Sequence, residues 1–296
     1  MIRLENVSKR FGAIEALAPL DLEIRAREWL GVVGRNGSGK TSLLRILVGL
    51  SRPSTGRLLL DGRAPGAEDW RSFRHRLGFM PERIQFHESL TGEKTLQYFA
   101  RLRGADGKKA SEILERVGLA SVAKRKVGGY SKGMIQRLNL AQALLGDPEV
   151  LVLDEPVEGF DPHGVRLFFD LVRSVKGRTV VFSSHRLPRF SGVVDRICVL
   201  SEGRVKALGT ESDLSRGLRL PFKVIIHPST DAGEALESAL SRLRPASLVC
   251  ENGRIVVSVS QADKIAFLSE LKGLDAAIRD LRIEEPSLEE VLLETG

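Results

Sequence analysis

Residues 34–41 have the sequence Gly-Arg-Asn-Gly-Ser-Gly-Lys-Thr, and no other stretch constrains the fold of this chain as strongly. The octet has the spacing G-x-x-x-x-G-K-[ST] of a phosphate-binding loop. Residues 29–34 before it form a short apolar run typical of a buried strand, and residues 42–50 after it have helical spacing. This order presents backbone N–H groups and a helix N-terminus to phosphate oxygens. A chance glycine turn would not have both flanks in register.

The loop combines backbone donors with two side chains of specific chemistry. The Lys40 ammonium is expected to reach the β- and γ-phosphates of a nucleotide, and the Thr41 hydroxyl is expected to ligate Mg²⁺. The residues expected to bind the nucleotide from this loop are Gly34, Asn36, Gly37, Ser38, Gly39, Lys40, Thr41 and Ser42.

A second apolar run, residues 151–155 (LVLDE), ends in two carboxylates. At the end of this strand, Asp154 is expected to hold Mg²⁺, and Glu155 is expected to polarise the attacking water as a general base. An acidic strand end is by itself more often structural. The phosphate loop upstream favours the catalytic interpretation.

Apolar runs alternate with helical patterns through most of the chain. Residues 149–156, 179–185 and 196–203 are typical of buried strands, and residues 92–127 and 132–145 have helical spacing. This alternation predicts an α/β fold with a largely parallel sheet. After residue 220 the order changes to strand, helix, strand, strand, helix, strand, which predicts a small ferredoxin-like α+β domain.

The charge is divided unevenly between these parts. Residues 222–296 carry 8 basic and 13 acidic side chains, whereas residues 1–221 carry 37 and 25. A basic body suits phosphates, nucleic acid or an anionic membrane face, and an arginine-rich surface without a partner explains it equally well. Only 5% of the residues are aromatic, so stacking on nucleic acid is not expected.

Residues 130–137, YSKGMIQR, precede the LVLDE strand at a predicted helix start. With this motif, the chain resembles the ATP-binding subunits of ABC transporters over roughly its first 215 residues. YSKGM stands where that family has its LSGGQ signature, and Lys132 and Met134 depart from the pattern. The resemblance implies that Ser131 and Gly133 contact the γ-phosphate of ATP held by a second copy of the chain.

The same resemblance divides the chain into domains. It implies a P-loop NTPase cassette over residues 1–217, with a helical subdomain at about 84–146. Residues 220–296 would then form the small C-terminal domain, with a role in regulation or dimerisation.

Further positions match the family one by one. Phe11, in Lys-Arg-Phe-Gly, has the place of the aromatic residue that stacks on adenine, although a core phenylalanine is the plain alternative. Asp161 lies in a segment that resembles the D-loop at the subunit interface. His185 resembles the switch histidine that contacts the γ-phosphate and the catalytic glutamate. Glu82 replaces the glutamine of the Q-loop, and its carboxylate is expected to approach Mg²⁺ through water.

The resemblance implies one composite mechanism, with ATP and Mg²⁺ as cofactors and Lys40, Glu155 and His185 as catalytic residues. Two copies would sandwich two ATP molecules and drive a separate integral membrane permease. No run approaches the roughly 18 apolar residues of a membrane helix, and the N-terminus lacks the apolar core of a signal peptide. The expected location is therefore cytoplasmic, peripheral on the inner face of the cell membrane.

The helical insert, the Pro-Glu form of the Q-loop and the closing PSLEEVLLETG resemble the ABC-2 export type. Within that group, GRAP at 62–65, residues 90–104 and residues 130–148 look most like the ATPases of nitrous oxide reductase maturation, which serve copper-site assembly. Three alternatives stay open. They are a generic exporter ATPase for drugs or lipids, a soluble ABC ATPase without a transport role, and a catalytically inactive regulatory cassette.

Overall fold

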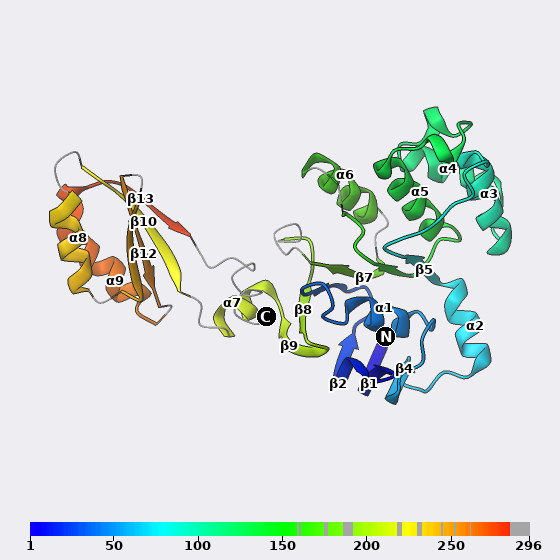
Figure 1. The fold of residues 1–296 in the computed structure, drawn as a ribbon, viewed down its shortest axis with the longest axis horizontal. Helices are drawn as coiled ribbons and strands as arrows, with labels where there is room; N and C mark the ends of the chain where they lie inside the picture. Colours follow the sequence, from blue (N-terminus) through cyan, green and yellow to red (C-terminus); the bar gives the residue numbers. More distant parts are fainter. Residues whose placement is uncertain are drawn as a thin grey trace. The chain divides into compact units, whose positions relative to one another are not determined.

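The computed structural model divides into two compact units, residues 1–208 and 209–295, and each is described by itself (Figure 1). The expected boundary at 217–220 differs from this division, because α7 (Glu211–Gly217) groups with the second unit. The structure describes residues 1–158, 160, 162–174, 177–185, 192–217, 221–229, 233–243, 245–251, 253–260 and 262–284.

A six-stranded sheet forms the centre of the first unit. Its order is β5-β6-β7-β3-β8-β9, and the first five strands pair in parallel. The strands are β3 Trp29–Val33, β5 Leu77–Met80, β6 Val150–Leu153, β7 Thr179–Ser184, β8 Arg196–Ser201 and β9 Arg204–Gly209. Every residue of β7 is buried, as expected of a strand covered on both faces. The prediction of an α/β fold with a largely parallel sheet is confirmed.

A second, antiparallel sheet has the order β2-β1-β4. Its strands are β1 Ile2–Phe11, β2 Ile14–Ile24 and β4 Thr55–Leu60. Leu20, Leu22 and Ile24 are buried while the residues between them are exposed, so alternation puts one face of β2 in the core. These side chains share one hydrophobic cluster with helix α1 and strand β3.

Six α-helices of the first unit accompany the two sheets. They are α1 Lys40–Leu47, α2 Ala67–His75, α3 Gly92–Leu102, α4 Lys108–Arg116, α5 Lys132–Leu144 and α6 Pro162–Arg173. Two short 3₁₀ turns, η1 Ala120–Val122 and η2 Val127–Gly129, precede α5, and α3, α4 and α5 lie together as a helical lobe (Figure 1). Among the described residues, no helix has the length and apolar character needed to cross a membrane.

The prediction for residues 92–127 was wrong in one respect, because the helical pattern is not continuous. The structure breaks it after α3 at Gly104, where φ is +67°, and ends α4 before Gly118, where φ is +70°. Glycine adopts such left-handed backbone without steric cost, so it is the usual helix terminator.

The second unit is a four-stranded antiparallel sheet in the order β11-β12-β10-β13. After α7 its elements are β10 Phe222–Pro228, α8 Gly233–Arg242, β11 Ser247–Glu251, β12 Arg254–Val259, α9 Lys264–Glu270, η3 Leu271–Ala277 and β13 Ile278–Glu284. The inward residues of β10 and β12 pack with Leu236, Leu240 and Phe267 in one apolar core.

Candidate functional site

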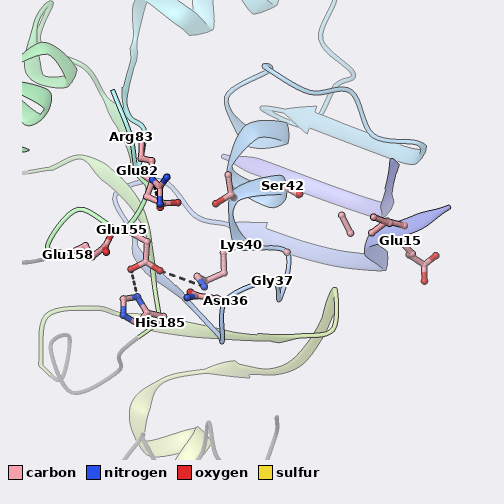
Figure 2. Close-up of a pocket in the computed structure, with 14 residues that line it drawn as sticks. Glu15, Asn36, Gly37, Lys40, Ser42, Glu82, Arg83, Glu155, Glu158 and His185 are labelled. Atoms are coloured by element: carbon pink, nitrogen blue, oxygen red, sulfur yellow. Dashed lines mark hydrogen bonds and ion pairs between the residues drawn. The ribbon is translucent and has the colours of Figure 1, made fainter. Parts of the chain in front are cut away.

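The candidate site lies where four parallel strands reach their carboxyl ends. Strand pairing sets Val33 beside Ser184, and Leu153 beside Phe182 and Met80, so β3, β7, β6 and β5 finish at one edge. Loops that leave this edge of a parallel sheet form the usual binding crevice of α/β folds. A cleft of about 460 Å³ opens there (Figure 2).

The phosphate loop follows β3, and two of its glycines are required by close packing. A side chain at Gly34 would lie 2.1 Å from the carbonyl oxygen of Leu200. Gly39 has φ +103°, and a side chain there would lie 2.5 Å from the carbonyl oxygen of Ala16. The loop is therefore wedged against β2 and β8, and α1 begins directly after Gly39.

The Lys40 ammonium is held inside the loop. Only 6% of this residue is exposed, and its Nζ donates to the carbonyl oxygens of Gly34 at 2.7 Å and Arg35 at 3.1 Å. Burial lowers the pKa of Lys40, and the carboxylates of Glu155, Asp154 and Glu82 oppose that shift. The cation is thus partly desolvated beside acidic groups, where a phosphate would strengthen its charged form.

The two carboxylates after β6 are almost completely buried. Ser183 links the Asp154 carboxylate to the main chain of Glu155, because its hydroxyl donates to Asp154 Oδ1 at 2.5 Å and accepts from the Glu155 N–H at 2.9 Å. Glu155 has φ +46°, an uncommon conformation for a residue with a side chain. Its backbone is therefore fixed by the neighbouring strand β7.

The Glu155 carboxylate lies between two cationic or titratable groups. Its Oε1 is 3.6 Å from Lys40 Nζ, and its Oε2 is 2.9 Å from His185 Nδ1 (Figure 2). His185 follows β7 directly and is half-buried. Residues from three strand ends thus form one continuous chain of side chains along the cleft wall.

Most of the predicted site residues meet in this cleft. Those that line it are Asn36, Gly37, Gly39, Lys40, Thr41, Ser42, Glu82, Glu155 and His185. Gly34 and Ser38 belong to the loop behind the lining, and Asp154 is buried below it with 2% exposure. The lining residues that the sequence did not predict are Ile14, Glu15, Ala16, Arg83 and Glu158.

Three further predicted residues, one on β1 and two at the start of α5, do not line the cleft. Phe11 is 49% exposed at the end of β1, with the Lys9 ammonium 4.9 Å from the centre of its ring. Ser131 caps α5 by accepting from the Met134 N–H, and Gly133 lies in the first turn of that helix; neither lines the cleft. Asp161 lies outside the described residues.

Helix α5 also supplies buried side-chain amides whose contacts the sequence did not predict. Gln136 Nε2 donates to the carbonyl oxygens of Glu155 and Pro156, Asn139 to that of Pro81, and Gln142 to that of Phe79. These three amide residues recur every third position among the buried residues of α5. That spacing was the available signal, because polar side chains on a buried helix face need partners.

The described residues fit a nucleotide phosphate. The Ser38 hydroxyl is buried in the loop without a hydrogen-bond partner in the described structure, an arrangement that a bound anion would relieve. Lys40 and the start of α1 supply positive charge at the same place. Thr41, Glu82 and Asp154 provide oxygen donors of the kind that Mg²⁺ prefers.

Comparison with known proteins gives one consistent answer. The family model described as ABC transporter matches residues 17–158. The daunorubicin resistance ATP-binding protein DrrA3 of Streptomyces coeruleorubidus is 34% identical over 99% of this chain and 94% of its own length. The Nod factor export ATP-binding protein I of Burkholderia lata is 37% identical over 70% of each chain.

A solved structure agrees in fold. The dimeric, post-hydrolysis ATP-binding cassette MJ0796, bound to ADP and Pi, aligns with a TM-score of 0.65 and 26% identity over 71% of this chain and 98% of its own. The phosphate loop, the buried carboxylates and these similarities together show that the chain belongs to the ATP-binding subunits of ABC transporters and is an ATPase coupled to transport.

Proposed function

We propose that the chain is the ATP-hydrolysing subunit of an export-type ABC transporter and powers a separate membrane permease. The observation that carries the catalytic part is the contact of Glu155 with both Lys40 and His185 at the phosphate loop. The names of two similar proteins, one for drug resistance and one for export, support the direction of transport.

The predicted catalytic and magnesium-binding residues each have a proposed part in hydrolysis. Lys40 and the loop N–H groups bind the β- and γ-phosphates, and Thr41, Asp154 and Glu82 hold Mg²⁺. When bound, Mg²⁺ neutralises charge on the phosphate oxygens. Glu155 accepts a proton from the attacking water, and His185 orients the Glu155 carboxylate through its 2.9 Å contact.

A second copy completes each site in this proposal. Ser131 and Gly133 lie away from their own chain's cleft, so they are free to contact ATP bound by a partner copy. Asp161 is proposed to act at the same interface, and Phe11 to stack on adenine. The dimeric state of the similar cassette MJ0796 supports this arrangement.

The proposed surroundings follow from the transporter family. The chain would work in the cytoplasm on the inner face of the membrane, bound to an integral permease, without a nucleic-acid partner. We assign the cassette to residues 1–217, with its helical subdomain at about 84–146, and a regulatory or dimerising domain to 220–296. The strand order β11-β12-β10-β13 and the helices after β10 and β12 support a ferredoxin-like class for that domain.

The proposed substrate class is based on the names of the similar proteins rather than on the predicted role in copper-site assembly. Drugs or lipids are the proposed class, because the similar proteins are named for resistance to daunorubicin and for Nod factor export. A role in copper-site assembly for nitrous oxide reductase stays a prediction. The described residues contain no group of three His, Cys, Asp or Glu side chains that could hold a metal ion.

Two measurements test the proposal. Glu155→Gln should bind ATP without hydrolysing it and sediment as an ATP-dependent dimer, whereas wild type with Mg²⁺ and ATP returns to monomers. A Glu155→Gln chain that stays monomeric with ATP would contradict the two-copy site. For the transport role, the chain is used to capture its membrane partner from detergent-solubilised membranes, and ATP hydrolysis by the purified complex is measured with amphiphilic drugs and with copper salts. Stimulation by copper alone would overturn the exporter assignment.

A further inference from the structure

The main chain at Glu155 has a conformation that needs support. Strand β6 ends at Leu153, and two residues later the backbone has φ +46°. Residues with side chains persist in this region only where their surroundings fix them, and such positions concentrate at functional sites. The direction of the Glu155 carboxylate depends on whatever holds this peptide.

Two side chains hold the main chain of Glu155, one at its N–H group and one at its carbonyl group. On the N–H side of Glu155, the Ser183 hydroxyl accepts at 2.9 Å. On the carbonyl side, Gln136 Nε2 lies 3.4 Å from the Glu155 oxygen and 3.3 Å from the Pro156 oxygen. Gln136 is 9% exposed, so its amide has no ready exchange with water.

Gln136 also belongs to the segment that begins with the signature motif. It lies on α5 three positions after Gly133 and five after Ser131, which caps the helix. An α-helix moves as one body over a turn or two because its backbone hydrogen bonds join successive turns. A displacement of the start of α5 therefore carries the Gln136 amide, and the carbonyls of Glu155 and Pro156, with it.

We propose that Gln136 is a positioning residue for ATP hydrolysis: it ties the start of α5 to the main chain of Glu155, so that ATP of a second copy, bound at Ser131 and Gly133, aligns the Glu155 carboxylate. This inference rests on the proposed function, since it takes Glu155 as the base and α5 as the contact to the second ATP. Gln136 lines no part of the cleft and acts only through the backbone of Glu155.

The test compares two buried glutamines of the same helix. Gln136→Met keeps side-chain length and removes the amide donor, and Gln142→Met does the same at a position whose amide donates to Phe79 instead. Gln136→Met should lower kcat about 10- to 100-fold while KM for ATP stays within about threefold, since misplacing a catalytic group costs that much. Gln142→Met should leave both constants within about threefold.

A second readout separates positioning from loss of structure. Gln136→Met with Mg²⁺ and ATP should accumulate as a dimer, as Glu155→Gln does, because binding is retained and hydrolysis is slow. The proposal is overturned if kcat of Gln136→Met equals that of wild type, or if kcat, ATP affinity and dimerisation fall together. A monomeric Glu155→Gln control would instead show that the two-copy site itself is wrong.

Should Gln136→Met fail to fold, the native glutamine still provides a test. In Glu155→Gln labelled with ¹⁵N in glutamine side chains, ATP-dependent dimerisation should shift the Gln136 amide resonance and leave that of Gln142 in place. Unchanged Gln136 resonances in the ATP-bound dimer would overturn the proposal.

Discussion

The two units of this chain bury different kinds of side chain. Within the described residues, every buried polar or charged side chain belongs to the first unit, among them Lys40, Asp154 and Glu155. The core of the second unit contains only apolar side chains, such as Phe222, Val224 and Leu240. The first unit is also the larger, so its extensive cores can bear the free-energy cost of enclosed charge.

The buried charges mark the part of the molecule that carries out the chemistry. Burial of a charge is unfavourable unless partners compensate it, so such groups persist mainly where chemistry requires them. In the first unit Lys40, Asp154 and Glu155 converge on one cleft, where they follow β3 and β6 and contact residues of β7 and the residue after it. The remaining buried carboxylate, Glu28, is compensated by an ion pair with Arg196. The second unit has the composition of a packing or interaction module, and we expect substitutions there to change stability rather than the chemistry of hydrolysis.

Removal of the Lys40 ammonium should give the largest effect and the sharpest contrast between the units. Lys40→Ala is expected to lower the rate of ATP hydrolysis about 100- to 1,000-fold, because the buried cation lies where negative charge develops. The matched control removes an exposed lysine of the second unit, Lys272→Ala, and should leave the rate within about twofold. Equal losses of rate in both variants would contradict the assignment of the chemistry to the first unit.

A cavity in the core of the second unit should lower stability and leave the rate of ATP hydrolysis nearly unchanged. Phe222 is fully buried in that core, and Phe222→Ala is expected to lower the free energy of unfolding of the second unit by about 3–5 kcal/mol. Denaturant unfolding monitored by hydrogen exchange should locate this loss in residues 222–284, while the initial rate of ATP hydrolysis stays within about threefold. A rate that falls in proportion to the stability would show that the second unit supports the catalytic state.

The sequence predicted the contiguous parts of this architecture well. The phosphate loop, the strand before Asp154 and the strand before His185 are single runs whose apolar pattern and glycines are local signals, and α1 begins within two residues of its predicted start. Helix α2 was missed because only Phe73 of its nine residues is buried, so its apolar periodicity is weak.

Contacts between distant parts of the chain escaped prediction. Gln136 meets the carbonyl of Glu155 across 19 positions, and Ser183 meets its N–H across 28. Gln136 belongs to the YSKGMIQR motif, but neither that motif nor the apolar pattern indicates a contact of Gln136 or Ser183 with the main chain of Glu155. Only the packing of α5 and β7 against β6 brings them together. The exposed position of Phe11 likewise depends on the turn between β1 and β2, which alternation alone does not fix.

Loss of the Ser183 hydroxyl should give an intermediate effect. Ser183→Ala leaves Asp154 Oδ1 without its donor and the Glu155 N–H without its acceptor, so a loss of about 1–3 kcal/mol in the free energy of unfolding is expected. ATP hydrolysis should slow about tenfold, since Glu155 loses one of its backbone supports. The control is Ser258→Ala on β12, a half-buried serine outside both cores, which should change neither quantity measurably. A wild-type rate in Ser183→Ala would show that Gln136 suffices to hold the peptide.

The smallest effect concerns the two cysteines, one in each unit. Cys198 is buried on β8 of the six-stranded sheet, where burial raises the pKa of its thiol to about 12, whereas Cys250 is exposed on β11. Because the thiolate is the reactive form, a maleimide at pH 8 should label Cys250 alone in the native chain, and Cys198 should react only in denaturant.

The raised pKa of Cys198 also makes the stability of the native chain depend on pH. The Cys198 thiol ionises near pH 9 in the unfolded chain and near pH 12 in the native chain. Its contribution to the free energy of unfolding is therefore fully present below pH 9 and declines as the pH rises between these values. Cys198→Ala should remove that part of the decline. Partial burial and the neighbouring Glu237 carboxylate also raise the pKa of the exposed Cys250 thiol, so Cys250→Ala should remove a smaller part. Rapid native labelling of Cys198 would show that the sheet of the first unit opens as readily as the surface of the second.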